Sequence, residues 1–175
     1  MTTLVRYWHG GIKVGSVADA LQAMVGRLEY LSGGSFRDVY INKARSVVYK
    51  VESPDGMADG SDNTREYEAE CALAECNCDC RAYAVPCTLY TTGTGRTIIA
   101  MPYYERPGYA AFSGHRSQFV RNIRAHNAAD HTPTIADMLD DNYRTDARGG
   151  IRITDLNLDP SEYRFLVETE TTGRL

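Results

Sequence analysis

The stretch that decides the fold is residues 31–52, which read LSGGSFRDVYINKARSVVYKVE. Turn-forming residues open it, and two runs rich in β-branched and aromatic residues follow at 36–41 and 46–52. Residues 42–45 join the two runs as a tight connection. The pattern predicts a flexible glycine turn over 31–35, followed by a β-hairpin.

Helices are predicted on both sides of this hairpin. Apolar residues recur at spacings of three and four over 17–30, which is typical of a short amphipathic helix. After the turn-forming loop 53–61, Asp62 can cap a second helix over 63–75. Tyr67, Cys71 and Ala74 are expected on the buried stripe of this second helix.

The remaining elements continue the same alternation. Two strands, 88–91 and 97–101, flank a glycine turn and predict a second hairpin. A helix is expected at about 115–129, and a third hairpin at 143–145 and 151–154. This order of elements predicts an α+β fold built on an antiparallel sheet.

In the predicted helix at 115–129, Phe119, Ile123 and His126 follow one another at spacings of four and three.

Composition limits the function classes. The chain has 175 residues, of which 43% are hydrophobic and 24% charged, as in an ordinary globular protein. Its formal net charge of -4 argues against nucleic-acid binding through bulk electrostatics. No apolar run is long enough to cross a bilayer, and the N-terminus lacks the apolar segment of a secretory signal. We therefore expect a cytoplasmic protein that does not bind membranes.

The cysteines leave one question open. Cys76, Cys78 and Cys80 form a C-x-C-x-C run, which Cys71 or Cys87 could complete as a four-cysteine zinc site. However, paired zinc ligands usually have two or more residues between them, and no histidine is near in the sequence. Buried cysteines that behave as small hydrophobic residues are the simpler interpretation. Five cysteines, an odd number, also argue against a disulfide framework.

Several segments supply the parts that phosphoryl transfer needs. Gly33 and Gly34 allow the backbone to approach phosphates closely, although a plain hairpin turn has the same composition. Lys50 lies in a β-branched run, and either Glu66 or Glu70 on the next helix is positioned to hold it. The alternative is that all three charged residues are solvated.

Acidic residues bracket the third predicted hairpin. Asp137 and Asn142 precede it, and Asp155 follows it. Their side-chain oxygens are the ligands that a divalent cation prefers, while the alternative is a solvated acidic turn.

Together these segments resemble the protein kinase superfamily over roughly residues 31–157. The spacing of Asp137 and Asn142 matches the D-x-x-x-x-N catalytic loop, and Asp155 follows where the D-F-G aspartate is expected. Three further segments resemble the glycine loop, the V-A-I-K strand and the link between the two lobes. They are Gly34–Val39, Val48–Lys50 and Met101–Tyr104.

A closer resemblance is to small kinase-like proteins encoded by bacteriophages. Three patterns recur in those proteins: G-S-F-R-x-V-Y, Y-K-V, and a helix with N-x-x-E. In this chain they stand at 34–40, 49–51 and 63–66. By this resemblance the protein acts in the cytoplasm of the host cell.

The kinase resemblance implies ATP and Mg²⁺ as cofactors and assigns a role to each matching residue. Lys50 contacts the α- and β-phosphates and pairs with Glu66, with Glu70 as the alternative partner. Asp137 is the base that orients the acceptor hydroxyl. By the same resemblance, Gly33, Gly34 and Ser35 cover the phosphates. Asn142 and Asp155 bind Mg²⁺. Backbone groups near Met101 and Tyr103 hold the adenine.

The chain also departs from the kinase pattern. Ile135-Ala136 stands where the catalytic loop has His-Arg, and Arg37 stands at an outer glycine position, where it either binds phosphates or fills the pocket. Only 18 residues follow Asn157. We therefore expect an N-terminal extension at 1–30, a kinase-like small lobe at 31–104 and a truncated large lobe at 105–175.

Three functions remain open on this basis. The first is a small phosphotransferase acting on an unknown acceptor or on itself. The second is a catalytically inactive pseudokinase that binds a host or self protein partner through Tyr103, Tyr104, Tyr109 and Phe112. The third function rests on Arg6–Gly11, which resembles the histidine-glycine strand of ADP-ribosyltransferases but lacks an identifiable downstream glutamate.

A homo-oligomer is a further expectation, because a second copy would cover the truncated lobe.

Overall fold

The computed structural model describes residues 11–14, 16–33, 37–52, 62–106, 109–131, 133–135 and 142–155. These residues form a mixed α+β structure that divides into two units. Unit 1 contains Met1–Glu68 and Val85–Tyr103, and unit 2 contains Ala69–Ala84 and Tyr104–Leu175. The expected α+β class is confirmed. The segment that resembles an ADP-ribosyltransferase strand lies almost entirely outside the described residues.

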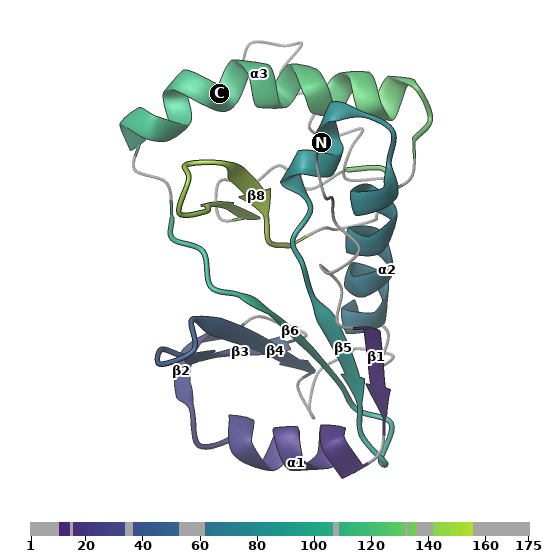
Figure 1. Cartoon of the computed structure of the whole chain (residues 1–175), viewed down its shortest axis with the longest axis vertical. Coiled ribbons are helices and arrows are strands. Elements are labelled where there is room, and N and C mark those ends of the chain that lie inside the picture. Colours follow the sequence, from purple (N-terminus) through teal and green to yellow (C-terminus); the bar gives the residue numbers. More distant parts are fainter. Residues whose placement is uncertain are drawn as a thin grey trace, which may run out of the picture. The chain divides into compact units, whose positions relative to one another are not determined.

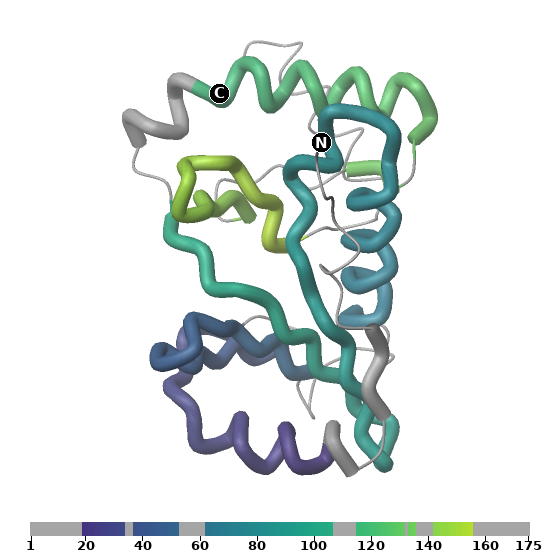
Figure 2. Tube along the Cα trace, viewed as in Figure 1, coloured from purple at the N-terminus to yellow at the C-terminus, as the bar shows by residue number. Residues whose placement is uncertain are grey.

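A six-stranded sheet forms the centre of unit 1, in the order β1-β5-β6-β4-β3-β2 (Figure 1). The five strands from β5 to β2 are antiparallel to their neighbours, whereas β1 pairs in parallel with β5. Figure 2 follows the chain as β5 and β6 return to this sheet after α2. The strand bounds are β1 Gly11–Val14, β2 Glu29–Gly33, β3 Arg37–Asn42, β4 Val47–Glu52, β5 Thr88–Thr91 and β6 Thr97–Pro102.

The hairpin predicted from residues 36–52 is confirmed as β3 and β4. Val39 lies opposite Lys50 and Tyr40 opposite Tyr49, so the register carries straight through both strands. Ser46 closes the turn with a φ of 50°. Because β4 also pairs with β6, the strand that holds Lys50 is central in the sheet.

The prediction for residues 17–35 is wrong in its second half. The helix α1, Ser16–Val25, ends before Gly26, and β2 then begins where the helix was expected to continue. Glycine disfavours the helix interior, and β2 gains a ladder of hydrogen bonds to β3 that a flexible turn would lack. The described residues of β2 are exposed, as suits the edge strand of the sheet.

Helix α1 covers part of the sheet of unit 1. Val25 is buried against Tyr49 and Ile98, and Leu21 and Met24 pack against the same cluster. At the other end of the helix, Asp19 Oδ1 accepts a hydrogen bond of 2.8 Å from the backbone N–H of Gly93, in the β5–β6 turn. The helix is thus tied to the sheet at both ends.

The helix α2, Asp62–Glu75, confirms the helix predicted at 63–75. Unit 2 combines its C-terminal part with a 3₁₀ helix, a long helix and a hairpin. Phe119 is the centre of its core, with the rings of Tyr83 and Tyr143 each 4.7 Å from its own and nearly perpendicular to it. The remaining elements are η1 Asp79–Tyr83, α3 Tyr109–Ala128, β7 Tyr143–Thr145 and β8 Ile151–Ile153.

The third hairpin is confirmed as β7 and β8. Its turn is organised by Asp146, which accepts hydrogen bonds from the backbone N–H groups of Arg148 and Gly150 and from the Arg152 guanidinium. Arg152 also donates to the carbonyl of Ala84, so the hairpin is linked to the segment after η1.

None of the helices in the described part of the chain combines the length and apolar character of a membrane span. The five cysteines, which all lie in the described range 62–106, form no disulfide with one another.

Candidate functional site

The first turns of α2 present two polar side chains to the sheet of unit 1. Asn63 and Glu66 lie three residues apart, which places them on one helix face. Both residues are buried, and Glu66 is only 1% exposed. A buried carboxylate is costly unless cations and hydrogen bonds compensate it, so its partners define the site.

Lys50 is the first partner of Glu66. It lies in the middle of β4, between Val39 on β3 and Ile99 on β6. Its Nζ is 2.7 Å from Glu66 Oε1 and 3.0 Å from Oε2, and its side chain is only 9% exposed. The expected pairing of Lys50 with Glu66 is therefore present in unit 1.

Arg37, the first residue of β3, is the second partner. Its Nη1 donates to Glu66 Oε2 and lies 3.5 Å from Asn63 Oδ1. Its side chain is 17% exposed. The sequence analysis expected Arg37 either to bind phosphates or to fill the pocket, and it did not expect a bond to Glu66. The side chain instead shares that carboxylate with Lys50.

Asn63 completes the arrangement through its amide. Its Nδ2 donates to the carbonyls of Lys50, at 3.1 Å, and Thr97, at 3.0 Å. The start of α2 is therefore bound to two adjacent strands, β4 and β6. We call Arg37, Lys50, Asn63 and Glu66 the Glu66 cluster.

The Glu66 cluster explains three separate sequence patterns. Arg37 is the arginine of G-S-F-R-x-V-Y, Lys50 is the lysine of Y-K-V, and Asn63 and Glu66 are the two fixed positions of N-x-x-E. Each pattern supplies a buried or partly buried polar group to one hydrogen-bonded network. Because a buried network is favourable only when its members are satisfied together, the patterns are expected to change as a group.

Of the glycine-turn residues predicted to cover the phosphates, Gly33 lies within the described part of the chain. Gly33 is the last residue of β2 rather than part of a loop, and it lies beside the ends of the Tyr30 and Asp38 side chains. Gly34 and Ser35 lie outside the described residues. Glu70, the alternative acid, is buried in unit 2.

The two residues expected near adenine differ in their surroundings. Met101 lies within β6, opposite Val48, and is buried. Tyr103 is 39% exposed, and its backbone N–H donates to the Ser46 carbonyl at 2.7 Å. An adenine contact at Tyr103 would therefore use its carbonyl rather than its N–H.

The predicted metal ligands Asn142 and Asp155 both belong to unit 2. The register of β7 with β8 brings them to the same end of the hairpin, because Thr154 N donates to the Asn142 carbonyl at 2.8 Å. Asn142 is buried and Asp155 is partly exposed. Asp137, the expected base, lies outside the described residues, so its position stays a prediction.

A known structure shares this arrangement of elements. It is the structure of a pseudokinase in its apo form, matched with a TM-score of 0.53 over 100% of this chain and 78% of that chain. The fold is similar to that of a pseudokinase. The two sequences are only 8% identical, so the similarity concerns the fold alone. No protein-family model and no curated protein matches the sequence. The resemblance to bacteriophage proteins stays a prediction.

Proposed function

We propose that this chain is a kinase-like nucleotide-binding protein in which Lys50 contacts the phosphates of ATP. The observation that carries the proposal is the buried ion pair between Lys50 and Glu66. In protein kinases a lysine on the third strand of the sheet pairs with a glutamate on the following helix, and this pair must form for productive phosphate binding. Lys50 lies on the third of three consecutive antiparallel strands, β2, β3 and β4, and Glu66 lies on the next helix.

The geometry suits this role because Lys50 is held before a ligand arrives. A free lysine side chain loses up to about 2 kcal/mol of conformational free energy when it is ordered. Here Glu66 contacts Nζ with both carboxylate oxygens, and strands on both sides enclose the backbone. The side chain of Lys50 therefore loses its conformational freedom when the protein folds. Binding of a triphosphate would not need to order it again.

Mg²⁺ fits the remaining residues of the proposal. Asn142 and Asp155 offer the hard oxygen ligands that Mg²⁺ prefers, and they lie at one end of one hairpin. Mg²⁺ would supply neutralisation of the phosphate charge. If phosphate is transferred, Asp137 would orient the acceptor hydroxyl and accept its proton.

A catalytically inactive pseudokinase that binds a protein partner is the second candidate, and Ile135 favours it. Ile135 stands at the position of the catalytic-loop histidine, yet it is buried in the core of unit 2. Its backbone exchanges two hydrogen bonds with the side chain of Asn127. This position serves packing rather than polar chemistry. The aromatic anchors expected for the partner include the exposed Tyr103 and the more buried Tyr104.

Calorimetric titration with ATP and Mg²⁺ tests nucleotide binding. A charged hydrogen bond is worth about 1.5–3 kcal/mol, so Lys50→Met is expected to weaken binding by about 10- to 100-fold. Lys43→Met is the matched control, because Lys43 lies in the β3–β4 turn and forms an exposed ion pair with Glu29. Absence of binding at millimolar nucleotide, or equal affinities for the two variants, would refute the proposal.

Transfer of label from γ-labelled ATP separates the two candidates. A phosphotransferase labels itself or a partner, and Asp137→Ala abolishes the labelling. A pseudokinase binds nucleotide or partner without transferring label. Labelling that persists in Asp137→Ala would show that Asp137 is not the base.

A further inference from the structure

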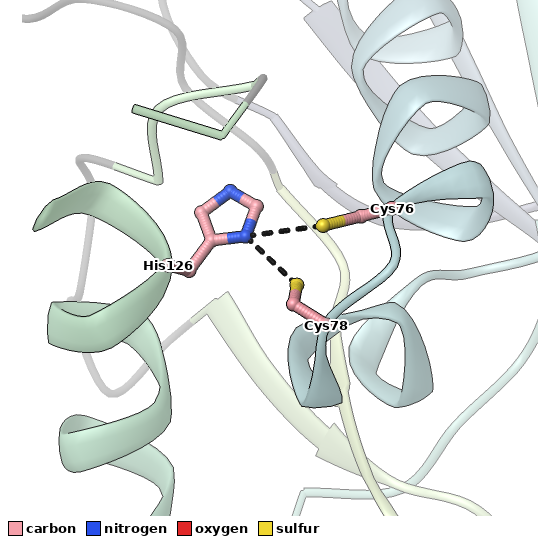
Figure 3. A group of neighbouring side chains, drawn as sticks. All are labelled: Cys76, Cys78 and His126. Atoms are coloured by element: carbon pink, nitrogen blue, oxygen red, sulfur yellow. Dashed lines mark hydrogen bonds between the residues drawn. The ribbon is translucent and has the colours of Figure 1, made fainter. Parts of the chain in front are cut away.

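Three metal-ligating side chains of unit 2 converge where the end of α2, the start of η1 and the last turn of α3 meet (Figure 3). Cys76 Sγ is 3.6 Å and Cys78 Sγ 3.1 Å from the same atom, Nδ1 of His126. All three ligand atoms lie within 4.8 Å of one another. Cys76 and His126 are buried, and Cys78 is partly buried.

The tautomer of His126 directs a lone pair toward the two sulfurs. Its Nε2 is 2.6 Å from the carbonyl oxygen of Pro133. A carbonyl only accepts hydrogen bonds, so Nε2 carries the proton and Nδ1 carries the lone pair. Metal-bound histidines generally have this arrangement, with the second ring N–H donated to a carbonyl or carboxylate that fixes the ring.

Hydrogen bonding alone does not account for this geometry. Nδ1 has one lone pair and accepts one hydrogen bond well, yet two thiols point at it in Figure 3. Thiols are also weak donors, which gives a second contact little energy. Two sulfurs that converge on one ring nitrogen are explained by a cation that all three atoms share.

The distances agree with a tetrahedral zinc site. Zinc binds sulfur at about 2.3 Å and nitrogen at about 2.0–2.1 Å, so tetrahedral angles place ligand sulfur and nitrogen about 3.6 Å apart. The Cys76–His126 distance of 3.6 Å already has this value. The Cys78–His126 distance of 3.1 Å needs an outward movement of about half an ångström, which a side-chain rotation supplies.

We propose that Cys76, Cys78 and His126 bind one Zn²⁺ ion. Thiolate and imidazole ligands select zinc over the hard cations, and a buried site with this set is typical of a structural zinc. The fourth position falls to water or to Cys80, a buried cysteine two residues after Cys78. The ion would join the end of α2 and η1 to the end of α3 within unit 2. This site is independent of the proposed nucleotide site.

Zinc binding would also change the protonation of the two cysteines. The thiolate is the form that binds the metal, so zinc binding would release the thiol protons.

The experiment uses the full chain stripped of metal with a chelator and then titrated with Co²⁺, which reports on zinc sites through its absorption spectrum. We expect one Co²⁺ per chain, a sulfur-to-cobalt charge-transfer band and the intense visible bands of tetrahedral cobalt. One equivalent of Zn²⁺ should remove the spectrum. The intensity of the charge-transfer band counts the thiolates and shows whether Cys80 completes the site.

Two pairs of variants locate the metal. Cys78→Ser and His126→Gln are expected to lower Co²⁺ affinity at least tenfold. Cys71→Ser, on α2, and His115→Gln, on the exposed face of α3, are the matched controls and should bind as wild type. The wild-type spectrum decides the question even if a ligand variant fails to fold. A wild-type chain without a thiolate–cobalt band, or ligand variants that bind as tightly as the controls, would overturn the proposal.

Discussion

The contacts of the Glu66 cluster predict that loss of the Glu66 charge destabilises the protein more than loss of the Lys50 charge. Glu66→Gln keeps the shape of the side chain but removes the charge that both Lys50 and Arg37 contact. At 2.7 Å and an effective dielectric constant of about 20, the gross attraction of Lys50 to Glu66 is about 6 kcal/mol. Desolvation of the buried groups offsets part of it. We therefore expect Glu66→Gln to lower the free energy of unfolding by about 3–5 kcal/mol.

Lys50→Met should cost less, although it removes the other half of the same ion pair. Methionine fills a similar volume with apolar atoms, and Glu66 keeps its contact with Arg37. The expected loss is about 1–3 kcal/mol. Chains of this length lose about 2–4 °C in Tm for each kcal/mol, so the two variants should separate clearly in a thermal melt.

Urea unfolding followed by circular dichroism measures both losses. The matched pair is Glu29→Gln and Lys43→Met, which breaks an ion pair whose side chains are 53% and 70% exposed. Each of these should change the free energy of unfolding by less than about 1 kcal/mol. The reasoning fails if Lys50→Met is as damaging as Glu66→Gln, or if the exposed pair costs as much as the buried one.

Three further predictions concern stability elsewhere in the chain. Burial raises the pKa of Asp146, but hydrogen bonds from Gly150 and Arg152 outweigh it, and the pKa in the folded state is lowered. The advantage of wild type over Asp146→Asn should therefore be constant above about pH 5 and shrink as the pH falls below about 4, in urea titrations at several pH values. Phe119→Ala should cost about 3–5 kcal/mol in the same assay, because it removes a buried ring that two others contact. Ser46→Gly should raise the Tm slightly, since a left-handed backbone costs a residue with a side chain about 1–2 kcal/mol, partly offset by the flexibility of glycine.

Local signals were sufficient for the elements that pair with their neighbours in the sequence. The hairpin β3–β4, the hairpin β5–β6 and the helix α2 follow from residue type, spacing and turn chemistry, because each is formed by one stretch of the chain or by two stretches joined by a short turn. Strand β1 could not be found this way. Its partner β5 is more than seventy positions away, with Gly11 opposite Thr88, and four residues carry too short a pattern.

The candidate nucleotide site was predictable in part. A resemblance of ordered motifs is enough to pair Lys50 with Glu66, and the structure contains that pair. The roles of Arg37 and Asn63 in the same cluster were missed, because a single sequence does not show that three patterns meet. Only the hydrogen bonds from Asn63 to the carbonyls of Lys50 and Thr97 reveal why an asparagine stands in the first turn of the helix.

The cysteine and histidine cluster is an arrangement that the cysteine spacing did not predict. The sequence interpretation disfavoured a zinc site at Cys76 and Cys78, because paired ligands usually have two or more residues between them. The chain bends at Asn77 and Cys78 between α2 and η1, and both sulfurs lie close to Nδ1 of His126. The histidine of the proposed site comes from 48 residues beyond Cys78, so no local motif contains it.

One signal for this histidine was nevertheless present in the sequence. His126 shares the helical spacing of Phe119 and Ile123 on α3, and all three are buried in the structure. A buried histidine needs a partner for each ring nitrogen, and the Pro133 carbonyl supplies only one. The second partner must be a donor or a cation. Because the side chains that meet Nδ1 are two cysteines, a soft cation satisfies the histidine and both sulfurs at once.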